Sequence, residues 1–232
     1  MPPITDGALL RLMTWMSPAF PVGAYSYSHG IEAAVERGLI TDAVGLRAWI
    51  DAILRHGSGR CDAILVYAAW QAERARDDVR LAETLAWADA FRATFEMALE
   101  SAAQGRAFLD GVRAAWPHPR LDALADLAAD LKRPPSYPLV AGVAIAAAGI
   151  DISAGLVAFV HAFAANLVSA GTRLIPLGQS DALRVLAGLE ATIRAVAQDA
   201  QGLGLADLGT ATWMVDWTSA RHETQYTRLF RS

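Results

Sequence analysis

The residues whose side chains could act in catalysis, metal binding or recognition lie close together near the start of the chain. They form the segment SPAFPVGAYSYSHGIE at residues 17–32. Its Pro18, Pro21 and Gly23 predict an irregular loop up to Ala24, because proline lacks an amide donor and restricts the residue before it. A helix starting there would carry polar side chains at positions i, i+3, i+4 and i+7, which share one face. Those side chains are Tyr25, Ser28, His29 and Glu32. The segment therefore predicts a rigid loop followed by a polar helical face suited to contact.

The polar residues of this segment do not form a catalytic or metal site by spacing alone. Ser28 and His29 are adjacent, so on a helix they point about 100° apart and cannot make a nucleophile–base hydrogen bond. His29 and Glu32 could supply two metal ligands, but a durable site needs three or four, and the other histidines are distant in sequence. One of these, His161, lies in an apolar run and is expected to be a hydrogen-bonded core residue. Two interpretations of the polar face remain open on the residues alone: a contact surface, or an internally hydrogen-bonded helix start that fixes the loop.

Nucleotide-binding motifs are missing from the sequence. Lys132 is followed by Arg133 and two prolines, whereas a P-loop needs a lysine followed by serine or threonine. Gly202, Gly204 and Gly209 do not have the spacing of a dinucleotide fingerprint, and no strand is expected before them. The chain is therefore not itself a P-loop hydrolase, and no cofactor is predicted.

The composition narrows the class of protein and its partners. With 232 residues and a formal net charge of -4, the chain can bury one sizeable core, and its scattered arginines form no basic stripe for a nucleic acid. The single cysteine, Cys61, excludes an internal disulfide and is expected to be a small buried hydrophobe. The start of the chain lacks the pattern of a signal peptide, so a cytoplasmic location is expected. The apolar run at 152–170 has the length of a membrane span, but it contains polar residues and lacks an aromatic belt; we expect a core helix and no membrane association.

Helical periodicity dominates the rest of the chain. Thr41 followed by Asp42 is expected to form the N-cap of a helix that ends at Gly57, and Gly38 is expected to end the helix before it. The prolines at 117 and 119 are expected to end another helix. Further helices are expected at about 139–148 and 152–169, and Pro176 is expected to open a long one. Alternating β-branched strands and hairpin dipeptides are missing. We predict an all-α, single-domain helical bundle of about nine to eleven helices over residues 1–225, followed by a tail at 226–232.

Two more segments have the composition of contact sites. In LIPLGQSDALRVL, residues 174–186, Gln179 is available to a partner, although physics alone favours an ordinary loop-to-helix junction. In SARHETQYTRLFRS, residues 219–232, arginines alternate with aromatic and apolar residues, and this mixture is typical of interface anchors. A tail of this kind either frays or docks.

The three segments together, SPAFPVGAYSYSHGIE, LIPLGQSDALRVL and RHETQYTRLFRS, resemble the urease accessory protein UreF family in order and in overall length. The resemblance covers essentially the whole chain, with conservative differences such as Tyr25 and Ile31 in place of phenylalanine and leucine. The helices between Asp62 and Leu131 carry no matching motif.

The resemblance implies a cytoplasmic, all-α maturation chaperone for urease with no catalytic activity of its own. Such a protein binds a UreD-type scaffold (UreH in some organisms) and recruits a UreG-type GTPase, and the complex docks onto apo-urease for nickel insertion. It also implies a homodimeric core and a tail at 226–232 that stays flexible until the UreD-type partner binds. Arginines that could influence GTP hydrolysis are Arg37, Arg173 and Arg221.

The resemblance and the composition together give a set of expected partner-binding residues, with no catalytic residue and no metal ligand. This set is Pro18, Phe20, Pro21, Tyr25, Ser28, His29, Glu32, Gln179, Arg221, His222, Glu223, Tyr226, Arg228, Leu229 and Phe230. The alternative function is a soluble helical protein that binds a small apolar ligand between the helices at 139–169.

Overall fold

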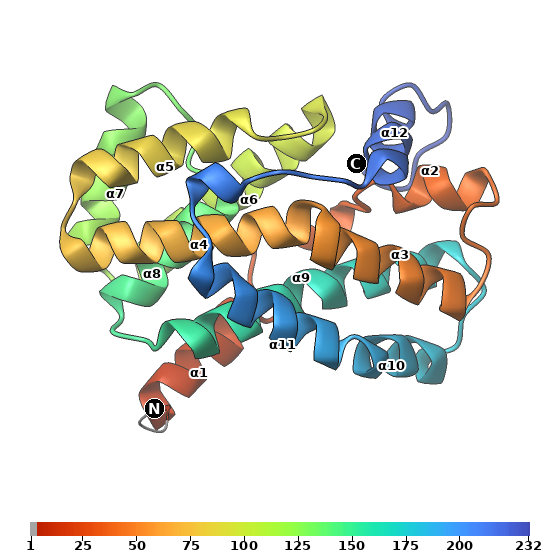
Figure 1. The fold of residues 1–232 in the computed structure, drawn as a ribbon, viewed down its shortest axis with the longest axis horizontal. Coiled ribbons are helices and arrows are strands. Elements are labelled where there is room, and N and C mark those ends of the chain that lie inside the picture. The colour runs from red at the N-terminus through yellow and green to blue at the C-terminus, as the bar shows by residue number, and fades with distance from the viewer. Residues whose placement is uncertain (1–3) are drawn as a thin grey trace.

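Every regular element in the described part of the chain, residues 4–232 of a computed structural model, is helical, and no strand occurs there (Figure 1). The α-helices are α1 (Asp6–Trp15), α2 (Ile31–Glu36), α3 (Ala43–His56), α4 (Ser58–Ala75), α5 (Asp78–Ala90), α6 (Phe95–Ala115), α7 (Pro119–Asp130), α8 (Tyr137–Ala147), α9 (Ile152–Leu174), α10 (Gln179–Gly188), α11 (Glu190–Asp199) and α12 (Trp213–His222). Short 3₁₀ turns lie at η1 (Ala24–Ser26), η2 (Ala200–Gly202) and η3 (Leu205–Asp207). The prediction of an all-α fold is confirmed.

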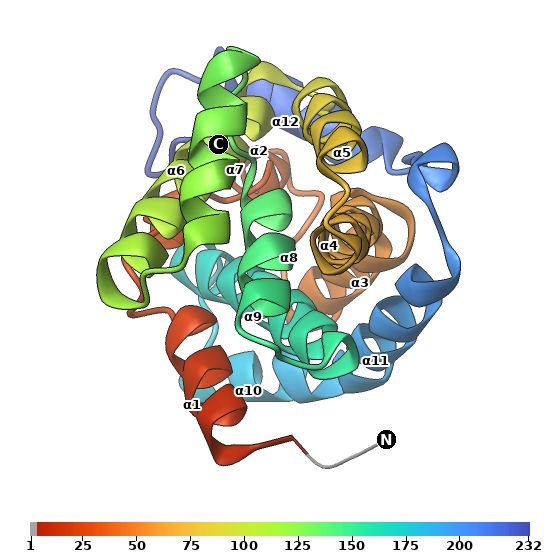
Figure 2. The ribbon, with the colours of Figure 1, turned by 90° about the vertical axis from the view of Figure 1, so that its left-hand side faces the viewer.

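The core is built around α8, which packs against α4 and α6 and has other helices around it (Figure 2). Small residues set these close approaches. A Cβ atom at Gly142 of α8 would overlap the carbonyl oxygen of Val66 in α4, and one at Gly155 of α9 would lie 2.9 Å from the Ile145 side chain of α8. Where α8 and α9 cross at Gly155 and Ile145, the two helices are in direct contact. The alternative function, a small apolar ligand bound between the helices at 139–169, stays a prediction.

Helix α9 is the one helix in residues 4–232 that is long and apolar enough to cross a membrane. One side of it, including Leu156, Phe159 and Leu167, is buried against α3, α4, α10 and α11. Its opposite side carries His161, which is exposed, so the prediction of a core histidine is wrong. The reason is that α9 is apolar nearly all round, and the sequence therefore does not show which face turns inward.

Several predicted helix ends are confirmed. Asp42 accepts a hydrogen bond from the backbone N–H of Gly45 and caps α3, and Gly57 ends that helix. Gly38 follows α2 with a φ of 71°, a left-handed conformation that glycine adopts without strain. Between α6 and α7, the chain breaks at Trp116–His118 and restarts with Pro119 at the first helical position.

The long helix expected to begin at Pro176 is wrong in two respects. Helix α10 begins at Gln179, where the N–H of Gly178 donates to the carboxylate of Asp181, and Pro176 lies in the preceding loop. The helical stretch is then divided at Leu189, which ends α10 and precedes α11. Leu189 is fully buried, and the break lets both helices follow the surface of α9.

Candidate functional site

The segment at residues 17–32 does not form the helix predicted from Tyr25 onward. Gly23 has a φ of 73°, the turn η1 follows, and His29 and Gly30 both adopt left-handed backbone conformations, with φ of 56° and 79°. Two successive left-handed residues cannot continue a right-handed helix, so α2 begins at Ile31. Gly30 is required at this turn, because a Cβ there would also lie 2.9 Å from the backbone nitrogen of Ser219 in α12.

The side chains predicted to share one helical face therefore point into different surroundings. Tyr25 is 70% exposed, whereas Ser28, His29 and Glu32 are buried. The prediction of a common polar face is wrong, and its cause is the backbone turn at His29. The residues of the preceding loop also differ in burial. Pro18 and Pro21 are exposed, whereas Phe20 is buried, with its ring centroid 5.1 Å from that of Phe108.

The end of the described chain returns to this segment. The N–H of Arg231 donates to the carbonyl of Ser26 (2.8 Å), and the N–H of Ser28 donates to the backbone oxygen of Ser232 (2.7 Å). Of the large apolar side chains of the tail, Phe230 is buried against the rest of the chain. The first and last of the three sequence segments are therefore one structural unit. The prediction that residues 226–232 are flexible before a partner binds stays a prediction.

A network of ionisable side chains holds this unit together, and we name it the tail clamp: the buried Glu32, Glu96 and His222, and Arg228, which is exposed. The carboxylate of Glu32 accepts hydrogen bonds from the backbone N–H groups of Leu229 (2.6 Å) and Phe230 (2.9 Å). His222 is fully buried, with Nε2 2.9 Å from Glu32 and Nδ1 2.7 Å from Glu96. Arg228 donates to the other oxygen of Glu96 (2.9 Å).

Both ring nitrogens of His222 take part in the clamp. Each faces a carboxylate oxygen, that of Glu32 at Nε2 and that of Glu96 at Nδ1. Pairing and hydrogen bonding of this kind are the conditions under which ionisable groups are tolerated in a protein interior.

His29 lies next to the clamp and belongs to a second buried group. Its Nε2 is 2.6 Å from the hydroxyl oxygen of Ser58, at the start of α4, and its Nδ1 is 3.5 Å from Glu100. Glu100 also accepts hydrogen bonds from Gln104 and from the Ser232 hydroxyl, both at 3.0 Å. Ser58, Glu96 and Glu100 could not be predicted as members of this unit, because no spacing in the sequence links them to residues 17–32. In residues 4–232, no group of three or more His, Cys, Asp or Glu side chains is placed to hold a metal ion.

Next to the buried unit lie Arg173, which contacts it, and two exposed side chains of the tail. Arg173 of α9 donates to the carbonyl of Tyr25 (2.6 Å), and its guanidinium lies 4.3 Å from the ring centroid of Phe230. Partial burial lowers the pKa of Arg173. Tyr226 is fully exposed and the side chain of Leu229 is 65% exposed. Two large apolar side chains of the tail thus face solvent although its backbone is anchored.

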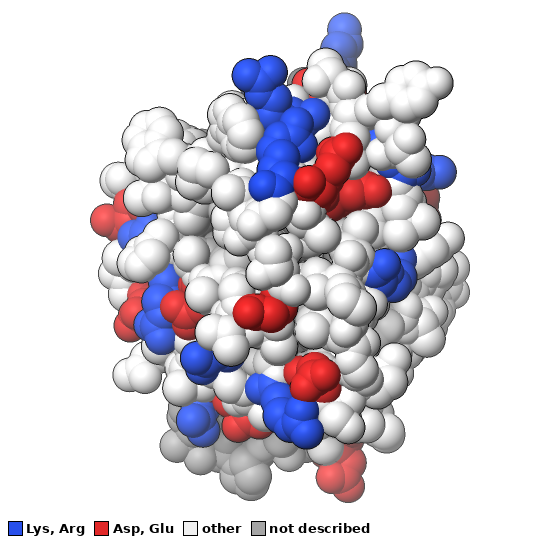
Figure 3. All heavy atoms as spheres, turned by 90° about the vertical axis from the view of Figure 1, so that its right-hand side faces the viewer, with Lys and Arg blue, Asp and Glu red and all other residues white. Residues whose placement is uncertain are grey.

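A second exposed cluster lies on α2 and α12. Arg37 and Arg221 each approach the ring of Trp217, at 5.5 and 5.7 Å from its centroid, and Trp213 is exposed one turn earlier. Glu223, just after α12, accepts a hydrogen bond from the N–H of Phe95. Gln179 is exposed at the start of α10. On the face viewed in Figure 3, arginine and lysine side chains form small separate groups beside acidic ones.

Comparison with known proteins gives a consistent result. A family model described as UreF matches residues 40–190. A protein named urease accessory protein UreF from Rhodopseudomonas palustris is 49% identical over 232 residues, covering 100% of this chain and 95% of the relative. Proteins with the same name from Bradyrhizobium diazoefficiens (50% identical, covering 97% and 92%) and Magnetococcus marinus (44% identical, covering 98% and 99%) are also similar over nearly their whole lengths.

Proposed function

Because the chain belongs to the UreF family of urease accessory proteins, we propose that it acts as a non-catalytic assembly factor that bridges a UreD-type (UreH-type) scaffold and a UreG-type GTPase during nickel insertion into apo-urease. In this role the protein changes no covalent bond. It holds the two partners in positions that let nickel pass between them, in the cytoplasm and as a homodimer within the complex. The family membership places the chain in urease maturation, and the identity of each partner is the proposal.

The observation that carries the proposal is the exposed apolar surface of the anchored tail. Tyr226 and Leu229 direct their side chains into solvent, while Glu32 holds the neighbouring backbone at Leu229 and Phe230. A pre-ordered backbone that presents an aromatic and an aliphatic side chain loses little entropy when a partner covers them. We assign the UreD-type contact to this surface together with Tyr25. Arg173 joins the two, because it donates to the carbonyl of Tyr25 and lies over the ring of Phe230.

We assign the GTPase contact to the cluster around Trp217. Arginine and tryptophan are the residues most enriched among binding hot spots, and Arg37 and Arg221 both lie at this ring. An arginine held here could also act on bound nucleotide in the partner. Replacing Arg37 and Arg221 by alanine tests both roles, since GTP hydrolysis and binding by the UreG-type protein are measured separately.

The decisive experiment is co-purification with a UreD-type protein. A chain ending at Thr224 is a poor test by itself, because it also removes the buried Phe230 and two partners of Glu32. The sharper variant is the double substitution Tyr226→Ser with Leu229→Ser, which changes only exposed side chains. We expect it to weaken the complex about tenfold or more and to leave the melting temperature unchanged. Val79→Ser, at an equally exposed apolar residue on α5, is the matched control. Unchanged binding by the double variant would refute the assignment of this surface.

A further inference from the structure

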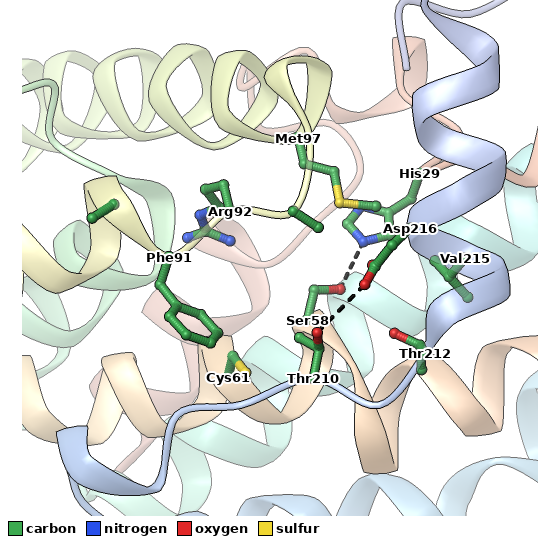
Figure 4. Close-up of a pocket in the computed structure, with 12 residues that line it drawn as sticks. His29, Ser58, Cys61, Phe91, Arg92, Met97, Thr210, Thr212, Val215 and Asp216 are labelled. Atoms are coloured by element: carbon green, nitrogen blue, oxygen red, sulfur yellow. Dashed lines mark hydrogen bonds between the residues drawn. The ribbon is translucent and has the colours of Figure 1, made fainter.

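Ser58 forms a close pair with His29 at the edge of a cavity of about 200 Å³ (Figure 4). The hydroxyl oxygen of Ser58 lies 2.6 Å from Nε2 of His29. The two residues come from different elements, since Ser58 opens α4 and His29 precedes α2. Ser28 is not part of the pair, because its hydroxyl donates to the backbone oxygen of Ser232. The serine–histidine contact that the spacing of Ser28 and His29 excludes is therefore made by a serine from another helix.

The surroundings of His29 favour the tautomer with its proton on Nδ1. This nitrogen is buried, has no hydrogen-bond partner among residues 4–232, and faces the carboxylate of Glu100 at 3.5 Å. Glu100 accepts hydrogen bonds from Gln104 and Ser232, as an ionised carboxylate does. A proton on Nδ1 is attracted to this carboxylate, whereas a lone pair there would be repelled by it. Nε2 then accepts the hydrogen bond from the Ser58 hydroxyl, which is the arrangement of a nucleophile and its general base.

The contact between His29 and Glu100 is longer than a hydrogen bond, but it has the direction that a base and its orienting group need. In structures without substrate, such contacts are often long and tighten when the substrate binds. The ring of His29 also meets that of Phe163 edge-on, with 5.5 Å between the ring centroids. The imidazole is therefore held between Ser58, Glu100 and an aromatic ring.

The cavity beside this pair has the size of a short acyl group. Its walls include the apolar side chains of Phe91, Met97 and Val215, which Figure 4 shows around the Ser58 hydroxyl. The volume is below the roughly 300 Å³ at which drug-sized sites begin, so an occupant has few heavy atoms. Asp216 also lines the cavity. An anionic molecule would meet this carboxylate, so the cavity suits an uncharged one.

The start of α4 supplies donors for the charge that develops when a hydroxyl adds to a carbonyl group. Ser58 is the first residue of the helix, and Gly57 before it has no side chain to cap the first turn. The backbone N–H groups of a first helical turn have no partner inside the helix. Donors of this kind stabilise the negative oxygen of the adduct. The serine that faces the base therefore also lies beside groups that can stabilise the product of its attack.

We propose that Ser58, activated by His29, is a nucleophile for acyl transfer from a small uncharged ester to water. The Ser58 oxygen adds to the ester carbonyl carbon, and its proton passes to Nε2 of His29. The bond to the leaving oxygen then breaks, and the alcohol departs with that proton. Water adds to the acyl group on Ser58 in the same way, which releases the carboxylic acid and returns a proton to the serine. Glu100 is a positioning residue for His29.

This activity goes beyond the assembly role, in which the protein changes no covalent bond, and it does not depend on it. The first test is labelling of the full chain with phenylmethylsulfonyl fluoride, an uncharged reagent with few heavy atoms, followed by mass spectrometry of the intact chain and of its peptides. We expect one covalent adduct, at Ser58, formed with loss of fluoride. Labelling that fails on the folded chain, or that persists in Ser58→Ala, would overturn the proposal.

Turnover is measured as release of p-nitrophenol from p-nitrophenyl acetate. His29→Asn removes the base and keeps a residue that tolerates the left-handed backbone of this position. It should lower the rates of labelling and of ester hydrolysis about 100-fold or more. Ser180→Ala, at an exposed serine in the first turn of α10, is the matched control and should behave as the parent. Circular dichroism confirms the fold of each variant, and a folded His29→Asn that reacts at the parent's rate would overturn the proposal.

Glu100→Gln tests the positioning role separately. Glutamine keeps the shape of the side chain but no longer attracts the proton on Nδ1 of His29. We expect a lower kcat for p-nitrophenyl acetate with an unchanged KM, because the walls of the cavity stay as they are. A raised KM with an unchanged kcat would indicate a structural effect and would overturn the role of Glu100. Because no partner protein is present in these assays, their failure leaves the assembly role untouched.

Discussion

Replacing Glu32 by alanine removes the centre of the tail clamp. The carboxylate is buried, and it accepts two backbone hydrogen bonds from the tail and pairs with fully buried His222. Breaking a buried ion pair by deleting one partner typically costs about 3–5 kcal/mol, because the remaining charge stays buried without compensation. A protein of this size has a total stability of about 5–15 kcal/mol, so the loss is a large fraction of it.

The expected result follows from the size of the chain. For domains of about 150–250 residues, each kcal/mol shifts the melting temperature by roughly 2–4 °C, so Glu32→Ala should melt about 6–20 °C lower than the parent. Thermal unfolding followed by circular dichroism measures this shift. Hydrogen exchange at the amides of Leu229 and Phe230 should accelerate in the same variant, because their acceptor is gone.

The matched control is Glu36→Ala on the same short helix. Glu36 is exposed and its ion pair with Arg37 is at 3.5 Å, so its removal should change stability by no more than about 0.5 kcal/mol. A melting temperature for Glu32→Ala equal to that of the control, or tail amides with unchanged exchange, would refute the reasoning. It would mean that water replaces the carboxylate without cost and that the clamp does not hold the tail.

Three other predictions test separate parts of the structure. Gly142→Ala should lose about 1–3 kcal/mol in urea unfolding, because its Cβ would overlap α4; Gly202→Ala, with open space at that position, is the control, and equal losses would contradict the close packing of α4 and α8. The raised pKa of Asp216 means that the folded state binds this proton more tightly than the unfolded state, so its contribution to stability is present below the ordinary value of 3.8 and is lost as pH rises. Asp216→Asn should therefore be more stable than the parent at pH 7, with the difference narrowing toward pH 4, and a constant difference across that range would count against the desolvated carboxylate. Burial also raises the pKa of Cys61, so the folded chain should react with Ellman's reagent at pH 8 far more slowly than the urea-unfolded chain, and comparable rates would show that this thiol is accessible.

Local signals in the sequence predicted much of the fold. The Asp42 cap, the stop at Gly57 and the proline break before α7 each depend on a backbone requirement of a single residue, and each was correct. The helix expected from Tyr25 was wrong, because the left-handed turn at His29 and Gly30 depends on contacts with α12 far along the chain. His161 was misplaced for a different reason, since an apolar helix with small residues on all sides gives no sign of its inward face.

The candidate site was predictable only in part. The sequence pointed to Glu32, His222 and Arg228, but as members of separate segments. Their association depends on the contacts of His222 with Glu32, 190 residues earlier in the chain, and with Glu96, 126 residues earlier. Neither Glu96 nor Ser58 stands in a motif, and no periodicity reports a contact over such distances. The likeness to a known family supplied the function, whereas the structure supplied the physical link between the first and last motifs.

The clamp also has a consequence for the order of events during synthesis. His222 emerges 190 residues after Glu32, and at about 5–20 residues per second the ribosome needs roughly 10–40 s to supply it. Throughout that interval the carboxylate of Glu32 has neither the imidazole nor the tail amides, so the segment at 17–32 cannot reach its final structure. Completion of this segment is therefore a late step, and a nascent chain keeps its first motif open until residues 222–230 have been made.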